Sequence, residues 1–129
     1  MYLPITSLFI GIFVPLYVLL SLRVVRTRRK NRIPLGDGGH PDLIKIISTH
    51  NNFSQYIPLA LVCMGFAEIQ GVNAIVLLGA GSALVVGRVS HAVGIIVAKP
   101  GANIPRVLGM VLTFTPLLIL ALAILLHLA

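Results

Sequence analysis

The sequence predicts an all-α integral membrane protein, built as a four-helix bundle. Hydrophobic residues make up 57% of the chain and charged residues only 10%, whereas soluble domains carry about 25% charged residues. The apolar residues gather into four long stretches, each near the roughly 20 residues that a helix needs to cross a bilayer. Polar and loop-forming residues separate these stretches. A chain of 129 residues has room for a single domain, residues 1–129.

The first predicted span covers residues 3–22. Pro4 lies in its first turn, where a missing backbone N–H costs nothing. Pro15 lies inside the span, where neighbouring groups can satisfy the carbonyl that it frees. A basic cytoplasmic loop is expected over residues 23–40. Because the basic cluster follows the apolar run, we interpret this segment as a retained anchor and not as a signal peptide.

The second predicted helix starts near Pro41 and ends near Ile69, which is longer than a membrane requires. Its polar first turns are therefore expected to project into water, and the span itself covers residues 53–69. Pro58 is expected to bend the helix just inside the membrane.

The third and fourth predicted spans cover residues 74–97 and 105–126. Between them, the stretch Lys99–Asn103 contains a Pro-Gly pair that breaks a helix, and Pro116 is expected to kink the fourth span. The third span carries small residues three and four apart, which predicts close contact with neighbouring helices. These residues are Ala80, Ala83, Gly87, Ser90 and Gly94.

The distribution of Lys and Arg predicts the orientation of the chain in the membrane. Seven of the ten basic residues lie between Arg23 and Lys45, and Lys99 and Arg106 flank the third connection. Four spans place these two basic segments on one side, and the opposite side carries no Lys or Arg. We therefore expect the basic segments in the cytoplasm and both termini on the other side. Charge placed beside apolar spans favours anionic membrane lipids, and not nucleic acid, as the partner.

Two groups of polar residues lie at membrane depth. Arg88 and His91 lie three apart within the third span, hence on one face of a helix. A cation there must be paired or hydrated, so Arg88 either snorkels to the interface or faces a polar cavity that holds an anion. Ser48, Asn52 and Gln55 share one face of the second helix. They form either an interfacial polar collar or a polar wall that meets the Arg88 and His91 face.

Two further arginines, Arg26 and Arg106, lie at the cytoplasmic ends of the first and fourth spans. Arg106 is just inside a helix start, where backbone N–H groups favour anions. The only acidic residue near a span, Glu68, lies at the opposite end, which argues against a proton-coupled drug exporter. The histidines are too far apart for a metal-ligand motif, and the single cysteine, Cys63, excludes an intrachain disulfide.

Several stretches together resemble a known family. Residues His50–Pro58, Gly87–Ala92 and Val25–Lys30 are similar to the second-helix, third-helix and first-helix motifs of the MAPEG proteins (membrane-associated proteins in eicosanoid and glutathione metabolism). The resemblance covers nearly the whole chain. It is nearest to the small bacterial branch, with Gly36–Gly39 before the second helix.

The resemblance implies a homotrimer in the cell inner membrane, with glutathione bound between neighbouring subunits near the cytoplasmic face. Carried over by motif position, Asn52 and His91 would hold the tripeptide, together with Arg88. Arg26 from a neighbouring subunit would meet a carboxylate of glutathione. Arg106 would lie near the sulfur, as the catalytic residue.

The chain departs from the family pattern within these motifs. Ser48 stands where the family usually has Arg, and Gln55 stands where it usually has Glu. Ile95 and Val107 occupy positions at which some members carry hydroxyl groups. Two functions are therefore open. One is a glutathione-dependent transferase or peroxidase that acts on a lipophilic electrophile, and the other is a non-catalytic protein that binds a lipid or small anion in the same cleft.

Overall fold

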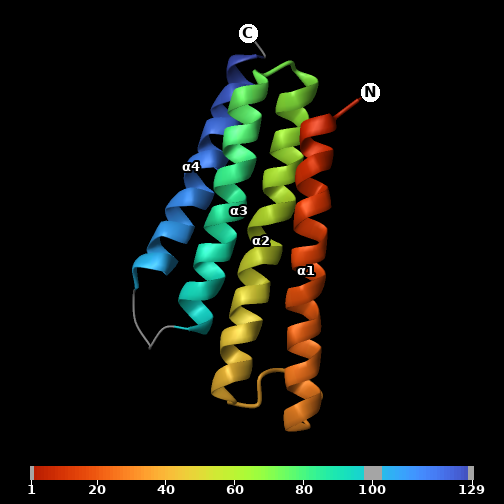
Figure 1. The fold of residues 1–129 in the computed structure, drawn as a ribbon, viewed down its shortest axis with the longest axis vertical. Helices are drawn as coiled ribbons and strands as arrows, with labels where there is room; N and C mark the ends of the chain where they lie inside the picture. Colours follow the sequence, from red (N-terminus) through yellow and green to blue (C-terminus); the bar gives the residue numbers. More distant parts are fainter. Residues whose placement is uncertain (1, 98–102, 128–129) are drawn as a thin grey trace.

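The computed structural model describes residues 2–97 and 103–127, and within these ranges all regular structure is helical. Its helices are α1 (Pro4–Asn31), α2 (Pro41–Ile69), α3 (Ala74–Ile96) and α4 (Ile104–Leu126). They run side by side in an up-and-down bundle, and the start of α1 and the end of α4 lie at the end of the bundle opposite the α1–α2 connection (Figure 1). The all-α fold is thus confirmed. Of the expected helix break at Lys99–Asn103, residues 99–102 lie outside the described residues, and Asn103 is the residue before α4.

The basic segment after the first span corrects one expectation. α1 continues through the basic run, so residues 23–31 are helical and do not belong to a loop over residues 23–40. The helix ends where Arg32 adopts a left-handed backbone with φ 56°, and Pro34 follows. The reason is that Lys and Arg are good helix formers and suit the C-terminal end of the helix dipole.

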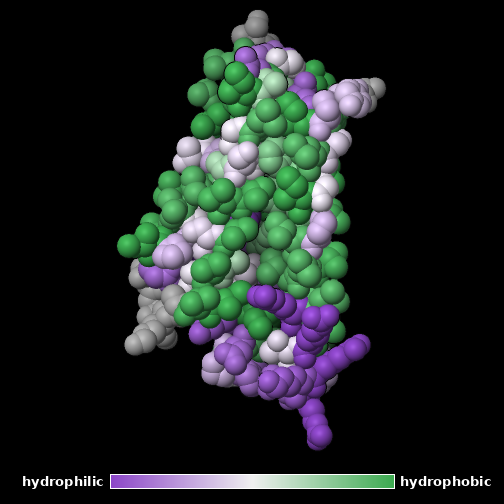
Figure 2. All heavy atoms as spheres, in the orientation of Figure 1, coloured by the Kyte–Doolittle hydropathy of each residue, from purple (hydrophilic) through white to green (hydrophobic). Residues whose placement is uncertain are grey.

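Three helices, α1, α3 and α4, are long and apolar enough to cross a membrane. α2 is not among them because its first half is polar. It nevertheless packs against each of the other three. The fourth span, over residues 53–69, stays a prediction. Figure 2 shows apolar side chains over most of the visible face and hydrophilic ones concentrated at the end where α1 and α2 are connected.

α1 and α2 pack through aromatic side chains. The rings of Phe13 and Phe53 meet edge to face with centroids 5.9 Å apart, and the Tyr17 and His50 rings lie 5.1 Å apart. His50 Nε2 is also 3.0 Å from the Ser21 hydroxyl oxygen. Large side chains therefore hold this pair together.

The N-terminus of α1 is capped by a side chain from α2. The carboxylate of Glu68 accepts hydrogen bonds from the backbone N–H groups of Ile5 and Thr6, at 2.9 and 2.8 Å. Leu3, the residue before the helix, supplies no cap of its own. The acid that the sequence places at the non-basic end thus fixes α1 to α2 and satisfies two otherwise unpaired donors.

α3 and α4 approach each other at glycines. A Cβ added to Gly109 would lie 2.6 Å from the Cβ of His91 and 2.7 Å from the carbonyl oxygen of Gly87. A Cβ added to Gly87 would lie 2.9 Å from that of Leu112. Only glycine permits this separation, so the small-residue contact expected for the third span is confirmed at this seam.

Candidate functional site

Arg88 is the central polar residue of the bundle, and its side chain is only 4% exposed. Its guanidinium donates hydrogen bonds to Asn52 Oδ1 on α2, and to the Thr113 hydroxyl and the Gly109 carbonyl oxygen on α4. The last of these bonds is 3.1 Å long. The Tyr56 ring lies beside it, with its centroid 5.5 Å from Arg88 Cζ. Arg88 therefore does not snorkel: it joins α2, α3 and α4 inside the bundle.

The chain supplies no carboxylate to balance the charge of Arg88. It contains three acidic residues. Glu68 caps α1, Asp37 binds the backbone N–H of Gly39 at 2.9 Å, and Asp42 lies in the first turn of α2. Neutral dipoles and an aromatic face therefore stabilise the cation, and these are stronger in a low-dielectric interior than in water.

His91 lies one helical turn after Arg88 and is also 4% exposed. Both residues line a hollow of about 10 Å³ together with Thr49 and Asn52. The backbone of His91 rests against Gly109 of α4. The structure thus brings Asn52, Arg88 and His91 together, as the face-to-face interpretation of the sequence predicts.

The remaining residues predicted for the site lie at the surface of the single chain. Ser48 and Gln55 are exposed on α2, Arg26 is exposed on α1, and Arg106 is exposed in the first turn of α4. Within the described residues, no hydrogen bond joins any of them to Arg88. The polar wall of α2 therefore meets α3 through Asn52, and its other two members face outward.

The position of Arg106 is set by the contact between the ends of α3 and α4. Asn103 accepts a hydrogen bond from the backbone N–H of Arg106 and donates one to the carbonyl oxygen of Gly94, both at 3.0 Å. A Cβ at Gly94 would lie 2.7 Å from the Arg106 nitrogen. Because Gly94 is three residues after His91, the first turn of α4 lies one helical turn beyond the buried site.

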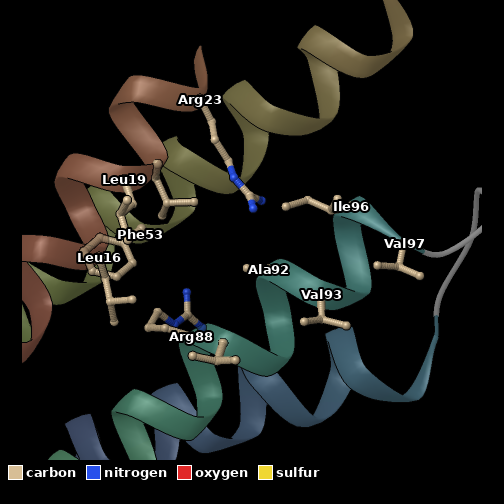
Figure 3. A pocket seen from close by; sticks show the side chains of 11 residues that line it. Leu16, Leu19, Arg23, Phe53, Arg88, Ala92, Val93, Ile96 and Val97 are labelled. Atoms are coloured by element: carbon tan, nitrogen blue, oxygen red, sulfur yellow. The ribbon is translucent and has the colours of Figure 1, made fainter. Parts of the chain in front are cut away.

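A cavity of about 520 Å³ lies between α1 and α3. Figure 3 shows Arg23 extending toward this cavity from α1, with Arg88 at its other end. The rest of the lining is apolar. It includes Leu16, Leu19, Leu20, Phe53, Val89 and Val93.

Two residues of these arrangements are missing from the sequence prediction. Thr113 was hidden because a threonine in an apolar helix normally bonds its own backbone, as it also does here with Gly109 at 2.7 Å. Thr113 lies four residues after Gly109, so the two residues share one face of α4. That spacing is the signal that could have placed Thr113 on the face of α4 that packs against α3. Arg23 was counted only as part of the basic segment, although its spacing of three from Leu20 continues one face of α1.

Comparison with known proteins adds a family match over most of the chain. The model of the MAPEG family matches residues 6–126. Two proteins named "Inner membrane protein YecN", from Escherichia coli strains K12 and O6:H1 (CFT073), are each 39% identical over 74 residues. The aligned part is 57% of this chain and 56% of each relative, so the match spans little more than half the length of these relatives.

Proposed function

The chain belongs to the MAPEG family and is an inner membrane protein, and we propose that it binds glutathione and directs its thiol at a lipophilic electrophile. The site lies between the subunits of a homotrimer. One observation carries the proposal: four polar residues at the basic half of the bundle are exposed around half-buried Asn52 and its buried partner Arg88. These four are Arg26, Ser48, Gln55 and Arg106. Exposed cations and polar groups at the membrane boundary favour an anionic partner, and a neighbouring subunit with an anionic tripeptide provides one.

Asn52 is the residue best prepared to hold the ligand. Its carbonyl oxygen accepts a hydrogen bond from Arg88, which fixes the side-chain amide and leaves the NH₂ group to donate. Arg88 acts here as a positioning residue, because its own guanidinium is already bonded to α2 and α4. Exposed Arg26 supplies a planar fork of donors that suits a glutathione carboxylate.

Arg106 is the residue that we propose activates the thiol. It combines an exposed cation with the N-terminal turn of α4, and both favour a thiolate over a thiol. The thiolate sulfur forms a bond to the electrophilic carbon, and the leaving group departs with the electron pair. The apolar helix surfaces around the cleft admit a substrate from the bilayer.

The thiolate form of bound glutathione tests this proposal directly. Purified protein mixed with glutathione should show thiolate ultraviolet absorbance at neutral pH, whereas S-methylglutathione, which lacks the thiol, should not. Arg106→Ala should remove the absorbance. Arg29→Ala, which removes an exposed cation elsewhere on α1, should keep it. The absence of thiolate absorbance at saturating glutathione would contradict the proposal.

A second function is favoured by a different observation. Val107 follows Arg106 and is 54% exposed, so at this position the cleft gains apolar surface and no hydroxyl donor. Gln55 likewise removes the charge best suited to the glutathione amine. A non-catalytic protein that binds a lipid or small anion in the cleft has these properties. Retention of such a ligand without glutathione-dependent turnover would support it, and turnover that disappears in Arg106→Ala would refute it.

A further inference from the structure

We propose that each subunit holds one anionic phospholipid between α1 and α3. One acyl chain occupies the cavity of about 520 Å³, and the phosphate occupies a polar recess at the basic end of that cavity. This site differs from the thiol site proposed above, and the argument for it does not depend on that function.

One face of α1 changes from apolar to basic along its length, which matches the order of acyl chain and anionic headgroup in a phospholipid. Leu16, Leu20, Arg23, Thr27 and Lys30 follow one another at spacings of four and three, so they form one stripe along the helix. The first three line the apolar cavity, and the last two line the recess. Along this stripe the surface therefore changes from apolar to basic in the order of an acyl chain followed by an anionic headgroup.

The recess has the donors that a phosphate needs. Its volume is about 320 Å³, and its lining includes Lys30, Lys45, His40 and Asp42. The two lysines outweigh the one acid. Within the described residues, the buried His40 Nδ1 has no hydrogen-bond partner, which leaves this atom for a ligand. Ile96 lines both the recess and the apolar cavity, so the two hollows adjoin.

The cavity suits an acyl chain in size and lining. Its volume lies within the roughly 300–1,000 Å³ typical of small-molecule sites. On the α3 side it is lined by Val89 and Val93, which are 48% and 47% exposed. Arg88 lines the deep end of the cavity. Its guanidinium is bonded to α2 and α4, so its aliphatic stem can contact an acyl chain. Arg23 projects near the Ile96 end, where a headgroup would lie (Figure 3).

The charge of the protein decides which lipid fits. The chain has ten Lys and Arg residues but only three acidic residues. A lipid without net charge would therefore leave the basic recess and Arg23 without a counter-charge. Basic pockets between membrane helices attract anionic headgroups in this way. The lipid site also lies away from the outward-facing polar residues of α2, because Gln55 is two residues, or about 200° around the helix, from the cavity residue Phe53.

Native mass spectrometry of the purified protein, incubated with equal amounts of dioleoyl phosphatidylglycerol and dioleoyl phosphatidylethanolamine, tests the selectivity. We expect one phosphatidylglycerol per chain to be retained in preference to phosphatidylethanolamine. The double variant Arg23→Gln with Lys30→Gln should reduce retention about 25-fold, which is about fivefold for each charge removed. The matched double variant Arg29→Gln with Arg32→Gln removes the same charge beside a different hollow and should retain the lipid.

A second pair of variants tests the acyl-chain cavity. Val93→Phe fills the cavity and should abolish retention. Val86→Phe lies two helical turns earlier on the same face, outside the cavity lining, and should not. Equal retention of the two phospholipids, equal losses in test and control variants, or retention of added oleate in place of phosphatidylglycerol would each overturn the proposal.

Photo-crosslinking of the wild-type protein keeps the proposal testable if a variant fails to fold. Phosphatidylglycerol with a diazirine in one acyl chain should label peptides containing residues 16–20 and 89–96. Labels spread over the exposed residues of α4, such as Leu118 and Leu122, would contradict a bound position between α1 and α3.

Discussion

α3 meets its two outer neighbours in opposite ways. Against α4 it uses Gly87 and Gly94, and Gly109 of α4 lets the two backbones come close. Against α1 it packs Gly81 on the Phe9 ring at the non-basic end. In its basic half it presents the branched residues Val89 and Val93, and a cavity of about 520 Å³ remains between the two helices there. One helix therefore provides a tight seam on one side and a ligand-sized hollow on the other.

The difference shows how a small bundle can bury a charge and still keep room for ligands. Close contact at the glycine seam brings the Gly109 carbonyl and the Thr113 hydroxyl within reach of Arg88. The aromatic contact between α1 and α2 holds α1 in place, and beside Val89 and Val93 a cavity separates it from α3. The seam thus stabilises the bundle and, through Arg88, positions Asn52, whereas the hollow is the proposed lipid site.

Filling the seam should have the largest effect on stability. Gly109→Val places a side chain against the backbone of His91 and Gly87, and overpacking of this kind costs about 3 kcal/mol. Gly79→Val adds the same atoms at an exposed glycine with nothing within 4 Å, so its unfolding free energy should change by less than about 0.5 kcal/mol. Unfolding in mixed micelles measures both. Equal effects would remove the distinction between seam and surface.

The same contrast applies to the two arginines of the cavity. Arg88→Lys keeps the charge but loses the planar fork, so two of three hydrogen bonds disappear and unfolding should become easier by about 2 kcal/mol. Arg23→Lys changes an exposed guanidinium at the cavity and should leave the unfolding free energy unchanged. A similar loss in both variants would contradict a structural role specific to Arg88.

The cap that attaches α1 to α2 at the non-basic end should contribute less to the unfolding free energy than the glycine seam or Arg88. Glu68→Ala removes both acceptors from the first turn of α1 and should cost about 1 kcal/mol, as other losses of a helix cap do. Glu68→Gln keeps one acceptor oxygen and should lose about half as much. Hydrogen exchange at the Ile5 and Thr6 amides would locate the change, and unaltered protection in Glu68→Ala would contradict the cap.

The fold was largely predictable from the sequence, because hydropathy and loop residues determine where membrane helices begin and end. The bounds of α2 followed from its loop residues and apolar run, and the small-residue seam of α3 followed from spacing. The extent of α1 did not, because the basic run was interpreted as a loop. The basic residues indicate which side of the membrane this segment lies on, but they do not break the helix, which continues to Asn31.

The candidate site was predictable only in part. Offsets of three and four placed Asn52 on one face of α2 and Arg88 on one face of α3, with a meeting of the two faces as one of two alternatives. In the structure Asn52 and Arg88 are bonded. Thr113 and the Gly109 carbonyl depend on how closely two helices approach, which no single helix reveals. The hollow at Arg23 likewise depends on how far α1 and α3 stand apart. Four of the predicted site residues are exposed on the single chain, so the roles proposed for them depend on the proposed neighbouring subunit. They are Arg26, Ser48, Gln55 and Arg106.

Calorimetric titration of glutathione into the protein in lipid nanodiscs tests the central claim, that the Asn52 side binds the tripeptide and the Arg23 side binds lipid. Asn52→Ala should weaken glutathione binding about tenfold, the value of one hydrogen bond to a charged group. The double variant Arg23→Gln with Lys30→Gln should bind glutathione as the wild-type protein does. Absence of glutathione binding in the wild-type protein, or equal loss in the two variants, would contradict the account.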